Sequence, residues 1–367
     1  MALNYKPNKV SVDLMSYRHY IRGSKKVGKT TLFYNLINTL YNGDMSKGLL
    51  LSVGSESGYQ ALDGLYAIEA PTWSDFIEIV DDLCENKHEN TFDCIAVDTV
   101  DELCVLAENE VCRRSQRETG NKCTINGAFG GYGAGRRMVA KLIDDALARL
   151  GRSGYGLFYI GHVKEKTTKE KNGDEYQQMV SNLAKDYDDI FANKADVIVM
   201  IDSEKTVSNN QLTSVKRYMH FRADNYYDCG TRFSNIEDKI ELSAQNYINA
   251  VTNAIKSSIK SAKADDKYIE EKKAQEKAEK EAYYQEHKEE LSSEEAFDEA
   301  NNTIEEKVSE TNSIITEINN IMKNLSQADR DNKKAALASA NLPTSPAAIK
   351  KLTDVDTLNQ ILNIIKA

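Results

Sequence analysis

The stretch Gly23-Ser24-Lys25-Lys26-Val27-Gly28-Lys29-Thr30-Thr31 decides the fold of this chain. It fits the pattern G-x-x-x-x-G-K-[ST] of a phosphate-binding loop, or P-loop. The two glycines let the backbone curl so that successive N–H groups point at a bound phosphate. Lys29 adds a positive charge for the β- and γ-phosphates, and the Thr30 hydroxyl is placed to ligate Mg²⁺. Residues 23–31 therefore predict a binding site for ATP and Mg²⁺.

The sequence around this loop is typical of a P-loop as well. A short strand-like run precedes it at residues 17–21, and apolar residues at helical spacing follow at Leu32, Leu36, Ile37 and Leu40. The N-terminus of that helix would face the phosphates. The strand is poor in aliphatic residues, and Lys25 and Lys26 stand where small residues are common. Neither feature removes an atom that phosphate binding needs.

A second motif ends on an acid. Residues 92–99 read Phe-Asp-Cys-Ile-Ala-Val-Asp-Thr, a buried strand pattern that ends at Asp98. This is a Walker B pattern, in which the aspartate reaches Mg²⁺ beside the P-loop. An apolar strand that ends in aspartate is common by itself, but this one follows the P-loop after one strand–helix unit. We therefore expect Thr30 and Asp98 to hold the metal ion together.

Strand and helix patterns alternate through the first 260 residues. Further buried strands are expected at 48–54, 155–160 and 196–201, strand candidates at 215–222 and after 228–232, and helices near 71–83 (with Ser74 as N-cap), 138–150 and 243–259. The polar residues 164–185 include Asn172-Gly173, a hairpin-type turn. This alternation predicts an α/β protein with a doubly wound, mostly parallel sheet and ligand groups at the strand C-termini.

The acidity of the chain is confined to one segment. Net charge is −10; residues 261–310 hold 8 Lys and 17 Asp or Glu, so 8 − 17 = −9, and the remainder holds 39 basic and 40 acidic residues, or −1. We expect a catalytic core over 1–260, an acidic helical or coiled-coil-like linker over 261–310 and a small helical unit over 311–367. The near-neutral core neither favours nor excludes nucleic-acid binding.

Composition also bears on the compartment. The six cysteines form no C-x-x-C pair, and no apolar run reaches the length of a transmembrane helix or a signal-peptide core. We expect a soluble, cytoplasmic protein with reduced cysteines, without a disulfide framework, a zinc site or a membrane partner.

Four positions separate the branches of P-loop proteins. A ParA-like ATPase has a lysine directly after the first loop glycine, where this chain has Ser24, and AAA+ proteins have an acid directly after the Walker B aspartate, where it has Thr99. Glu56 follows the strand between the two motifs, where RecA-like proteins place the acid that polarises water; the alternative is a surface acid. His162 ends the strand after Walker B, where it is either a γ-phosphate sensor or a buried, hydrogen-bonded imidazole.

In their order along the chain, these motifs resemble the phage-encoded RecA-like NTP-binding proteins, including Sak-type single-strand-annealing ATPases. The resemblance spans roughly residues 15–245 and rests on the stretches 23–32, 73–75, 94–98, 130–137, 161–166 and 228–232. It implies a RecA core that binds single-stranded DNA in an ATP-linked manner and promotes annealing or strand pairing. It also implies a homo-oligomer, ring or filament, and suggests a phage single-strand-binding or replication protein as partner.

The resemblance implies roles for single residues. Lys29 and Thr30 would bind phosphate and Mg²⁺, Glu56 would be the base and His162 the sensor. Two DNA-binding loops would fall at 126–137 and 164–185, with the candidates Phe129, Tyr132, Arg136, Arg137, Lys164 and Lys166. Cations after the fifth strand sit where RecA-like subunits reach a neighbour's ATP site: Lys216, Arg217, Arg222 and Arg232, of which Arg222 is the catalytic candidate.

Plainer interpretations remain open for several of these residues. The glycine-rich stretch 126–137 is equally well a connector, and the lysines of 164–185 are balanced by acids, which also fits a solvated hairpin. The chain would otherwise be a nucleotide-dependent loader or scaffold that binds a protein through its C-terminal helices, or a helicase- or packaging-type motor. The tail would then be either a binding element or a solubilising spacer.

Overall fold

The computed structural model describes residues 10–55, 58–169, 173–208, 211–259, 266–292, 311, 313–349, 352 and 354–366. The chain divides into two compact units. Unit 1 comprises residues 1–106 and 142–292, and unit 2 comprises 107–141 and 293–367. Helices α3 (Val100–Thr119) and α4 (Ala134–Arg152) contribute residues to both units. This division differs from the sequence-based one, which kept residues 107–141 with the core.

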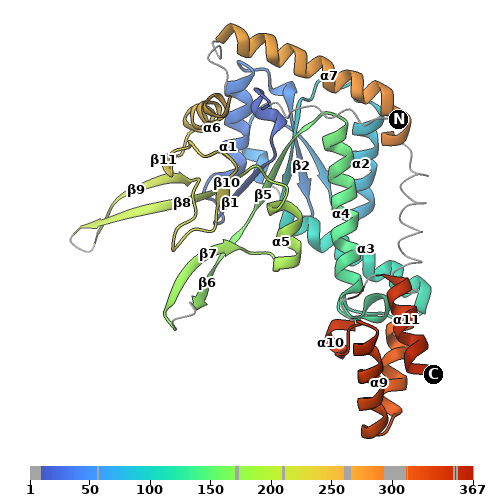
Figure 1. Cartoon of the computed structure of the whole chain (residues 1–367). Helices are drawn as coiled ribbons and strands as arrows, with labels where there is room; N and C mark the ends of the chain where they lie inside the picture. The colour runs from blue at the N-terminus through green and yellow to red at the C-terminus, as the bar shows by residue number, and fades with distance from the viewer. Residues whose placement is uncertain are drawn as a thin grey trace. The chain divides into compact units, whose positions relative to one another are not determined.

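The described part of unit 1 is built on a nine-stranded sheet (Figure 1). Its order is β11-β9-β8-β1-β5-β4-β2-β3, and β10 pairs with β8 off this path. The strands are β1 (His19–Gly23), β2 (Gly48–Val53), β3 (Tyr66–Ala70), β4 (Cys94–Asp98), β5 (Gly156–Gly161), β8 (Val197–Ser208), β9 (Gln211–His220), β10 (Gly230–Thr231) and β11 (Lys239–Glu241). Strands β3, β2, β4, β5, β1 and β8 pair in parallel, whereas β9, β10 and β11 are antiparallel to their neighbours. The mostly parallel α/β sheet is confirmed.

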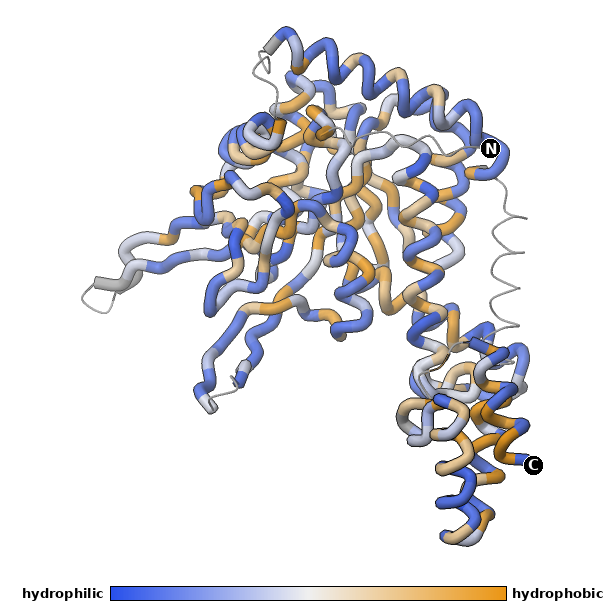
Figure 2. The backbone as a smooth tube through the Cα atoms, viewed as in Figure 1, coloured by the Kyte–Doolittle hydropathy of each residue, from blue (hydrophilic) through white to orange (hydrophobic). Residues whose placement is uncertain are grey.

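Both faces of this sheet are covered, as parallel strands require. Ile21 of β1 packs in one core with residues of α1 (Lys29–Leu40) and α6 (Ala244–Ser258). Tyr20, the preceding residue, points to the other face, where its ring lies 5.9 Å from that of Phe191 in α5 (Lys185–Ala192). The apolar colouring of the strands in Figure 2 marks this buried layer.

Two hairpins extend from this core (Figure 1). One is formed by β8 and β9; the other, β6 (Val163–Lys169) with β7 (Glu175–Ser181), is a separate antiparallel sheet. The turn predicted at Asn172-Gly173 falls between β6 and β7 in the sequence, and residues 170–172 lie outside the described ranges. Figure 2 shows both hairpins mainly in hydrophilic colours.

Helix α2 (Trp73–Glu85) begins at a different cap from the expected one. The backbone N–H of Asp75 donates to Thr72 Oγ1, and the Asp75 carboxylate accepts from the backbone N–H of Thr72, so that the pair forms a capping box. The prediction of Ser74 as N-cap is wrong, because Ser74 lies inside the first turn. The remaining short helices of unit 1 are η1 (Leu14–Ser16), η2 (Met45–Lys47) and η3 (Gly58–Ala61).

The acidic segment contains a long helix, α7 (Asp266–Ser292), which is part of unit 1. Glu276 accepts hydrogen bonds from Ser11 Oγ at 2.6 Å and from Val12 N at 3.0 Å. Further along, Tyr284 is fully buried, and its hydroxyl donates to Cys84 O at 2.6 Å. The described part of the expected linker is therefore helical, as predicted, and docked rather than solvated all round.

Unit 2 has a hydrophobic core of its own. It includes η4 (Ala128–Gly130), helical residues 313–324, α9 (Gln327–Ser339), α10 (Pro346–Ile349) and α11 (Val355–Lys366). The buried residues of the C-terminal helices form one cluster: Ile314, Ile315, Ile318, Leu337, Ile349, Leu358, Ile361, Leu362 and Ile365. Among the helices described in either unit, none is long and apolar enough to cross a membrane.

A neutral histidine is buried at the start of β1. His19 Nε2 lies 3.0 Å from Leu14 O, which can only accept, so Nε2 carries the proton. Nδ1, 2.6 Å from the Tyr247 hydroxyl, accepts from it. Burial lowers the pKa of His19 from 6.5 to about 4.

This histidine predicts a loss of stability in mild acid. Between pH 6.5 and about 4 the unfolded chain binds a proton on His19 that the folded chain does not, so the free energy of unfolding falls as the pH is lowered. By pH 5 this loss is about 2 kcal/mol. Urea unfolding of wild type and His19→Gln at pH 7 and pH 5 measures it, because the variant lacks this contribution. Equal losses in the two proteins would contradict the assignment.

The capping box predicts unequal effects of two neighbouring substitutions. Thr72→Ala removes the acceptor for Asp75 N and should cost about 1 kcal/mol of unfolding free energy. The matched control Ser74→Ala, two residues on at an exposed position, should change it by less than about 0.5 kcal/mol. Denaturant unfolding of both variants measures these costs. A larger cost for Ser74→Ala than for Thr72→Ala would indicate that Ser74 is the N-cap after all.

Candidate nucleotide-binding site

The two glycines of the loop are required for different reasons. Gly28 is the N-cap of α1 and has φ of 108°, a left-handed conformation that other residues rarely adopt. A Cβ added to Gly23 would lie 2.8 Å from Ile201 O of β8. Gly23 therefore permits the close approach of two strand ends, and Gly28 permits the turn into the helix.

The side chains that follow Gly28 meet the Walker B aspartate. Lys29 is 6% exposed, and its Nζ donates to Gly23 O at 2.9 Å and to Ser24 O at 3.0 Å. Thr30 Oγ1 donates to Asp98 Oδ2 at 2.6 Å. The two motifs meet because β1 and β4 run parallel with β5 between them, so that both end at the same edge of the sheet.

Thr30 and Asp98 fit the metal that the motif implies. Both present oxygen atoms, the ligands that Mg²⁺ prefers, and a protein usually supplies only one or two of them beside the nucleotide phosphates. The N–H groups of Lys29 donate to carbonyls of its own loop, and a bound phosphate could accept these hydrogen bonds instead. The chemistry of these three side chains therefore matches a Mg²⁺–nucleotide complex.

The other loop residues divide between surface and core. Ser24, Lys25, Lys26 and Thr31 are exposed. Val27 is 5% exposed and belongs to the core that α1 shares with β1, so its side chain serves packing.

A buried cation stands directly before the loop. Arg22, 1% exposed, donates from Nη2 to both carboxylate oxygens of Asp188 at 2.7 Å. Its Nη1 donates to Asp228 O at 3.2 Å and lies 3.3 Å from Asp228 Oδ2. The guanidinium also lies over the Tyr20 ring, 4.3 Å from its centroid. Sequence reasoning missed this group, although an arginine inside a buried strand is itself a signal of a buried partner.

Asp101, three residues after Asp98, joins the site to the β6–β7 hairpin. Its carboxylate accepts from His162 N at 2.9 Å and from Asn182 Nδ2 at 3.1 Å, and His162 Nδ1 lies 3.5 Å away. Burial acts to raise the pKa of Asp101, but hydrogen bonds from His162 and Asn182 hold it below its usual value. The predicted sensor His162 therefore lies between the first turn of α3 and the end of β7.

The base of the hairpin is also bound to the loop that contacts Arg22. Met179 N in β7 donates to Tyr226 O at 2.6 Å, and Asp228 N donates to Met179 O at 3.0 Å. Asp228 thus contacts both the residue before the P-loop and the second strand of the hairpin.

Two predicted catalytic residues have different outcomes. Glu56 lies outside the described residues, so its role as base remains a prediction. Arg222 Nη2 donates to Phe233 O at 2.6 Å and to Ser234 O at 2.5 Å, which closes a loop of its own unit.

Sequence reasoning missed an acid of α3, Glu102. Its side chain lies against Gly54, which follows β2, and its Oε2 would be 2.8 Å from a Cβ on Gly54.

The predicted DNA-binding residues fall in different units. In unit 2, Phe129 is 5% exposed, so its ring does not face solvent, whereas Tyr132 is 40% exposed. Arg136 Nε donates to Asn126 Oδ1 at 3.3 Å, and Arg137 Nη1 donates to Tyr132 O at 3.2 Å.

The lysines of the other predicted loop lie on β6 in unit 1. Lys164 Nζ donates to Asn182 O at 2.8 Å, and Lys166 is exposed. Lys169 pairs with Glu175 across the hairpin at 3.2 Å.

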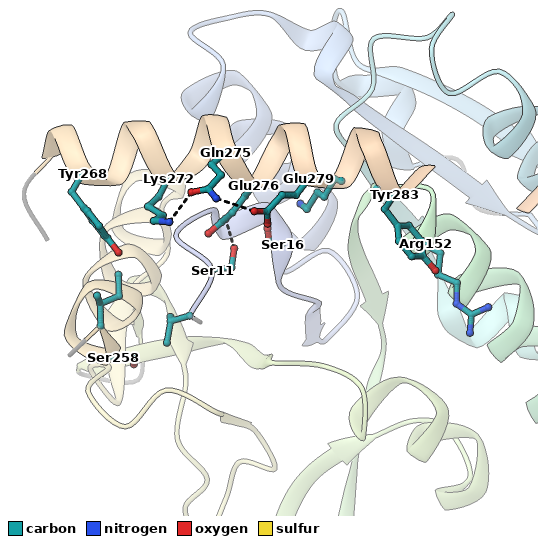
Figure 3. A pocket seen from close by; sticks show the side chains of 15 residues that line it. Ser11, Ser16, Arg152, Ser258, Tyr268, Lys272, Gln275, Glu276, Glu279 and Tyr283 are labelled. Carbon is teal, nitrogen blue, oxygen red and sulfur yellow. Dashed lines mark hydrogen bonds between the residues drawn. The ribbon is translucent and has the colours of Figure 1, made fainter. Parts of the chain in front are cut away.

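A cavity of about 900 Å³ beneath α7 lies away from this site (Figure 3). Ser16 and Gly154 in its lining precede β1 and β5, so the cavity lies at the edge where the parallel strands begin. Ligands of such sheets bind at the opposite edge, where the P-loop is.

A family model described as an AAA domain matches residues 15–233, more than half of the chain. The match includes the P-loop, the Asp98 strand and the β6–β7 hairpin. No curated protein matches the chain significantly.

The buried ion pair predicts a large and specific cost of substitution. Asp188→Ala leaves the guanidinium of Arg22 partly uncompensated and should cost about 3 kcal/mol of unfolding free energy. The double variant Arg22→Met/Asp188→Leu should cost less, because it removes both charges. The control Asp189→Ala, on the same helix, should cost less than about 1 kcal/mol. Urea unfolding measures all three; a double variant that costs as much as Asp188→Ala, or more, would contradict the coupling.

Proposed function

The chain belongs to the AAA domain family, a family of P-loop NTPases, and from this premise we propose that it is an ATPase of the RecA-like branch. In this proposal it binds single-stranded DNA and promotes annealing or strand pairing in phage recombination. The observation that carries the ATPase part is the contact of Thr30 with Asp98 beside the buried Lys29.

The chemistry follows from the positions of these groups. Lys29 binds the β- and γ-phosphates, while Thr30 and Asp98 would hold Mg²⁺, which would neutralise phosphate charge. Glu56, which follows the β2 segment in the sequence, orients a water for in-line attack on the γ-phosphorus, and the bond to the bridging oxygen breaks to release ADP. The proton of the attacking water leaves with the phosphate product or through Glu56.

The DNA-binding part is supported by the connection between the site and the hairpin. Asp101 follows the Walker B strand and binds both His162 and Asn182, at the two ends of β6–β7. A change at the γ-phosphate would move the end of the hairpin that Asp101 contacts. The exposed lysines of β6 would then bind DNA more or less tightly. Phosphate contacts by such cations are independent of sequence.

Assembly belongs to the same proposal. A RecA-like protein acts as a ring or filament of identical subunits on DNA, in which a subunit can complete its neighbour's ATP site. A single-strand-binding or replication protein of the phage is the partner that this role suggests.

A second candidate is a nucleotide-dependent loader or scaffold that acts on a protein. It is favoured by the separate hydrophobic core of the C-terminal helices. Because α7 belongs to unit 1, where Tyr284 donates to Cys84 O, the discriminating truncation ends after residue 292 rather than at 260. A chain of residues 1–292 keeps DNA binding under the first candidate and loses partner function under the second.

ATP turnover tests the first candidate directly. We expect wild type to hydrolyse ATP faster when a single-stranded oligonucleotide is added, and Lys29→Ala to show neither basal nor stimulated turnover, because it lacks the phosphate-binding cation. A phosphate-release assay measures both rates. Turnover that ignores DNA, together with no DNA binding at low salt, would sink the recombination role.

The hairpin yields a paired test on DNA affinity. Lys166→Ala should weaken oligonucleotide binding and reduce the slope of log affinity against log salt by about 0.7. Lys169→Ala is the matched control, because Lys169 is already paired with Glu175. Fluorescence anisotropy over a salt series decides; equal effects of the two variants would remove the hairpin from the DNA site.

A further inference from the structure

An arginine of β9 lies beside the P-loop of its own chain. Arg217 Nη1 is 3.6 Å from the point where a Cβ on Gly28 would be, and Leu242 Cδ2 is 3.5 Å from it. Gly28 caps α1, at the end that binds phosphate in a P-loop. The guanidinium is therefore within a side-chain movement of a phosphate held there.

The sheet fixes the backbone of this arginine. Arg217 pairs with Ser203 of β8, and its carbonyl accepts from Leu242 N at 2.8 Å on the other side. Strand β8 in turn pairs with β1, which ends in Gly23. Arg217 and the P-loop are thus parts of one hydrogen-bonded sheet.

Other cations of this region already have partners. Arg222 holds two backbone carbonyls. Arg232 lies 3.4 Å from Asp196 Oδ1 and donates to Asn193 O at 3.0 Å. Lys239 pairs with Glu204 and lies 4.2 Å from the centroid of the Tyr218 ring.

Arg217 differs from these cations. Its side chain is exposed, and it makes no hydrogen bond or ion pair with any residue in the described part of the chain. A planar guanidinium is suited to phosphate, which it can bind through two parallel N–H bonds.

We propose that Arg217 contacts the phosphates of the nucleotide bound by the P-loop of the same chain. The sequence had placed this residue among cations that reach a neighbour's site; its position beside Gly28 assigns it to its own. The proposal rests on the nucleotide site of the proposed function and not on its DNA-binding part.

A cation supplied within the chain has a consequence that a neighbour's cation lacks. Nucleotide affinity gains from Arg217 in each separate chain, so the gain does not depend on protein concentration. A cation supplied by a neighbour would strengthen binding only where subunits assemble.

Equilibrium binding of a fluorescent ATP analogue to the full-length chain tests the contact. Arg217→Ala should weaken binding by about 10-fold or more at every protein concentration. Arg217→Lys, which keeps the charge without the fork, should recover part of the loss. Lys205→Ala is the matched control: Lys205 pairs with Val215, so it lies on the same face of the hairpin as Arg217, two positions further along.

A mixing experiment separates the two assignments. Arg217→Ala is mixed with Lys29→Ala, and ATP turnover is followed. If Arg217 acts within its chain, no site in the mixture has both Lys29 and Arg217, and the mixture is no faster than its Arg217→Ala component. If it acts on a neighbour, turnover is restored where the two variants meet.

Restored turnover, or an Arg217→Ala chain that binds ATP like wild type, would overturn the proposal. If Arg217→Ala does not fold, as judged by circular dichroism, an Arg217→Lys chain with unchanged affinity would overturn it equally. Wild type that binds ATP but ignores DNA would contradict the DNA role and leave Arg217 in place. If wild type binds no nucleotide, both the Arg217 proposal and the proposed ATPase function are wrong.

Discussion

The ion pair between Arg22 and Asp188 is the contact on which the arrangement of the site depends. Arg22 is almost completely buried, so its charge is tolerated only because carboxylates and a carbonyl surround it. It is also the residue before Gly23. The contacts of Arg22 therefore connect the end of β1 to α5 and to the loop that holds Asp228.

The same group of residues explains how a nucleotide site can act on a hairpin. One connection runs from Arg22 through Asp228 to Met179 of β7, and the other from α3 through Asp101 to Asn182. Both reach the C-terminal end of β7, at Met179 and at Asn182. In the proposed function, a shift of either motif on nucleotide binding would reach the base of the β6–β7 hairpin through these hydrogen bonds, of which those to the carboxylates of Asp101 and Asp228 are charge-assisted. These contacts support the proposal that ATP binding controls how the hairpin binds DNA.

The parts that could be predicted from the sequence are those whose chemistry is local. The P-loop and the Asp98 strand could be predicted from the spacing of a few residues, and the buried parallel strands from runs of apolar residues. Strand β3 was missed because Tyr66 and Ile68 are exposed at the sheet edge, so no buried run marks it. The partners of Arg22 lie more than 160 residues away in the sequence, where no local pattern can find them. The family match is at the level of P-loop NTPases; the RecA-like branch, argued from Thr99 and Glu56, stays a proposal.

The central claim is that the nucleotide state of the P-loop is transmitted to the β6–β7 hairpin through Arg22 and Asp101. Hydrogen–deuterium exchange of the full chain, with and without ATP and Mg²⁺, tests it most directly. We expect slower exchange at the P-loop and changed exchange in β7 and at Asn182, which follows it. In Asp101→Asn, the change at the P-loop should remain and much of the change in β7 should be lost. Protection confined to the P-loop in wild type would contradict it.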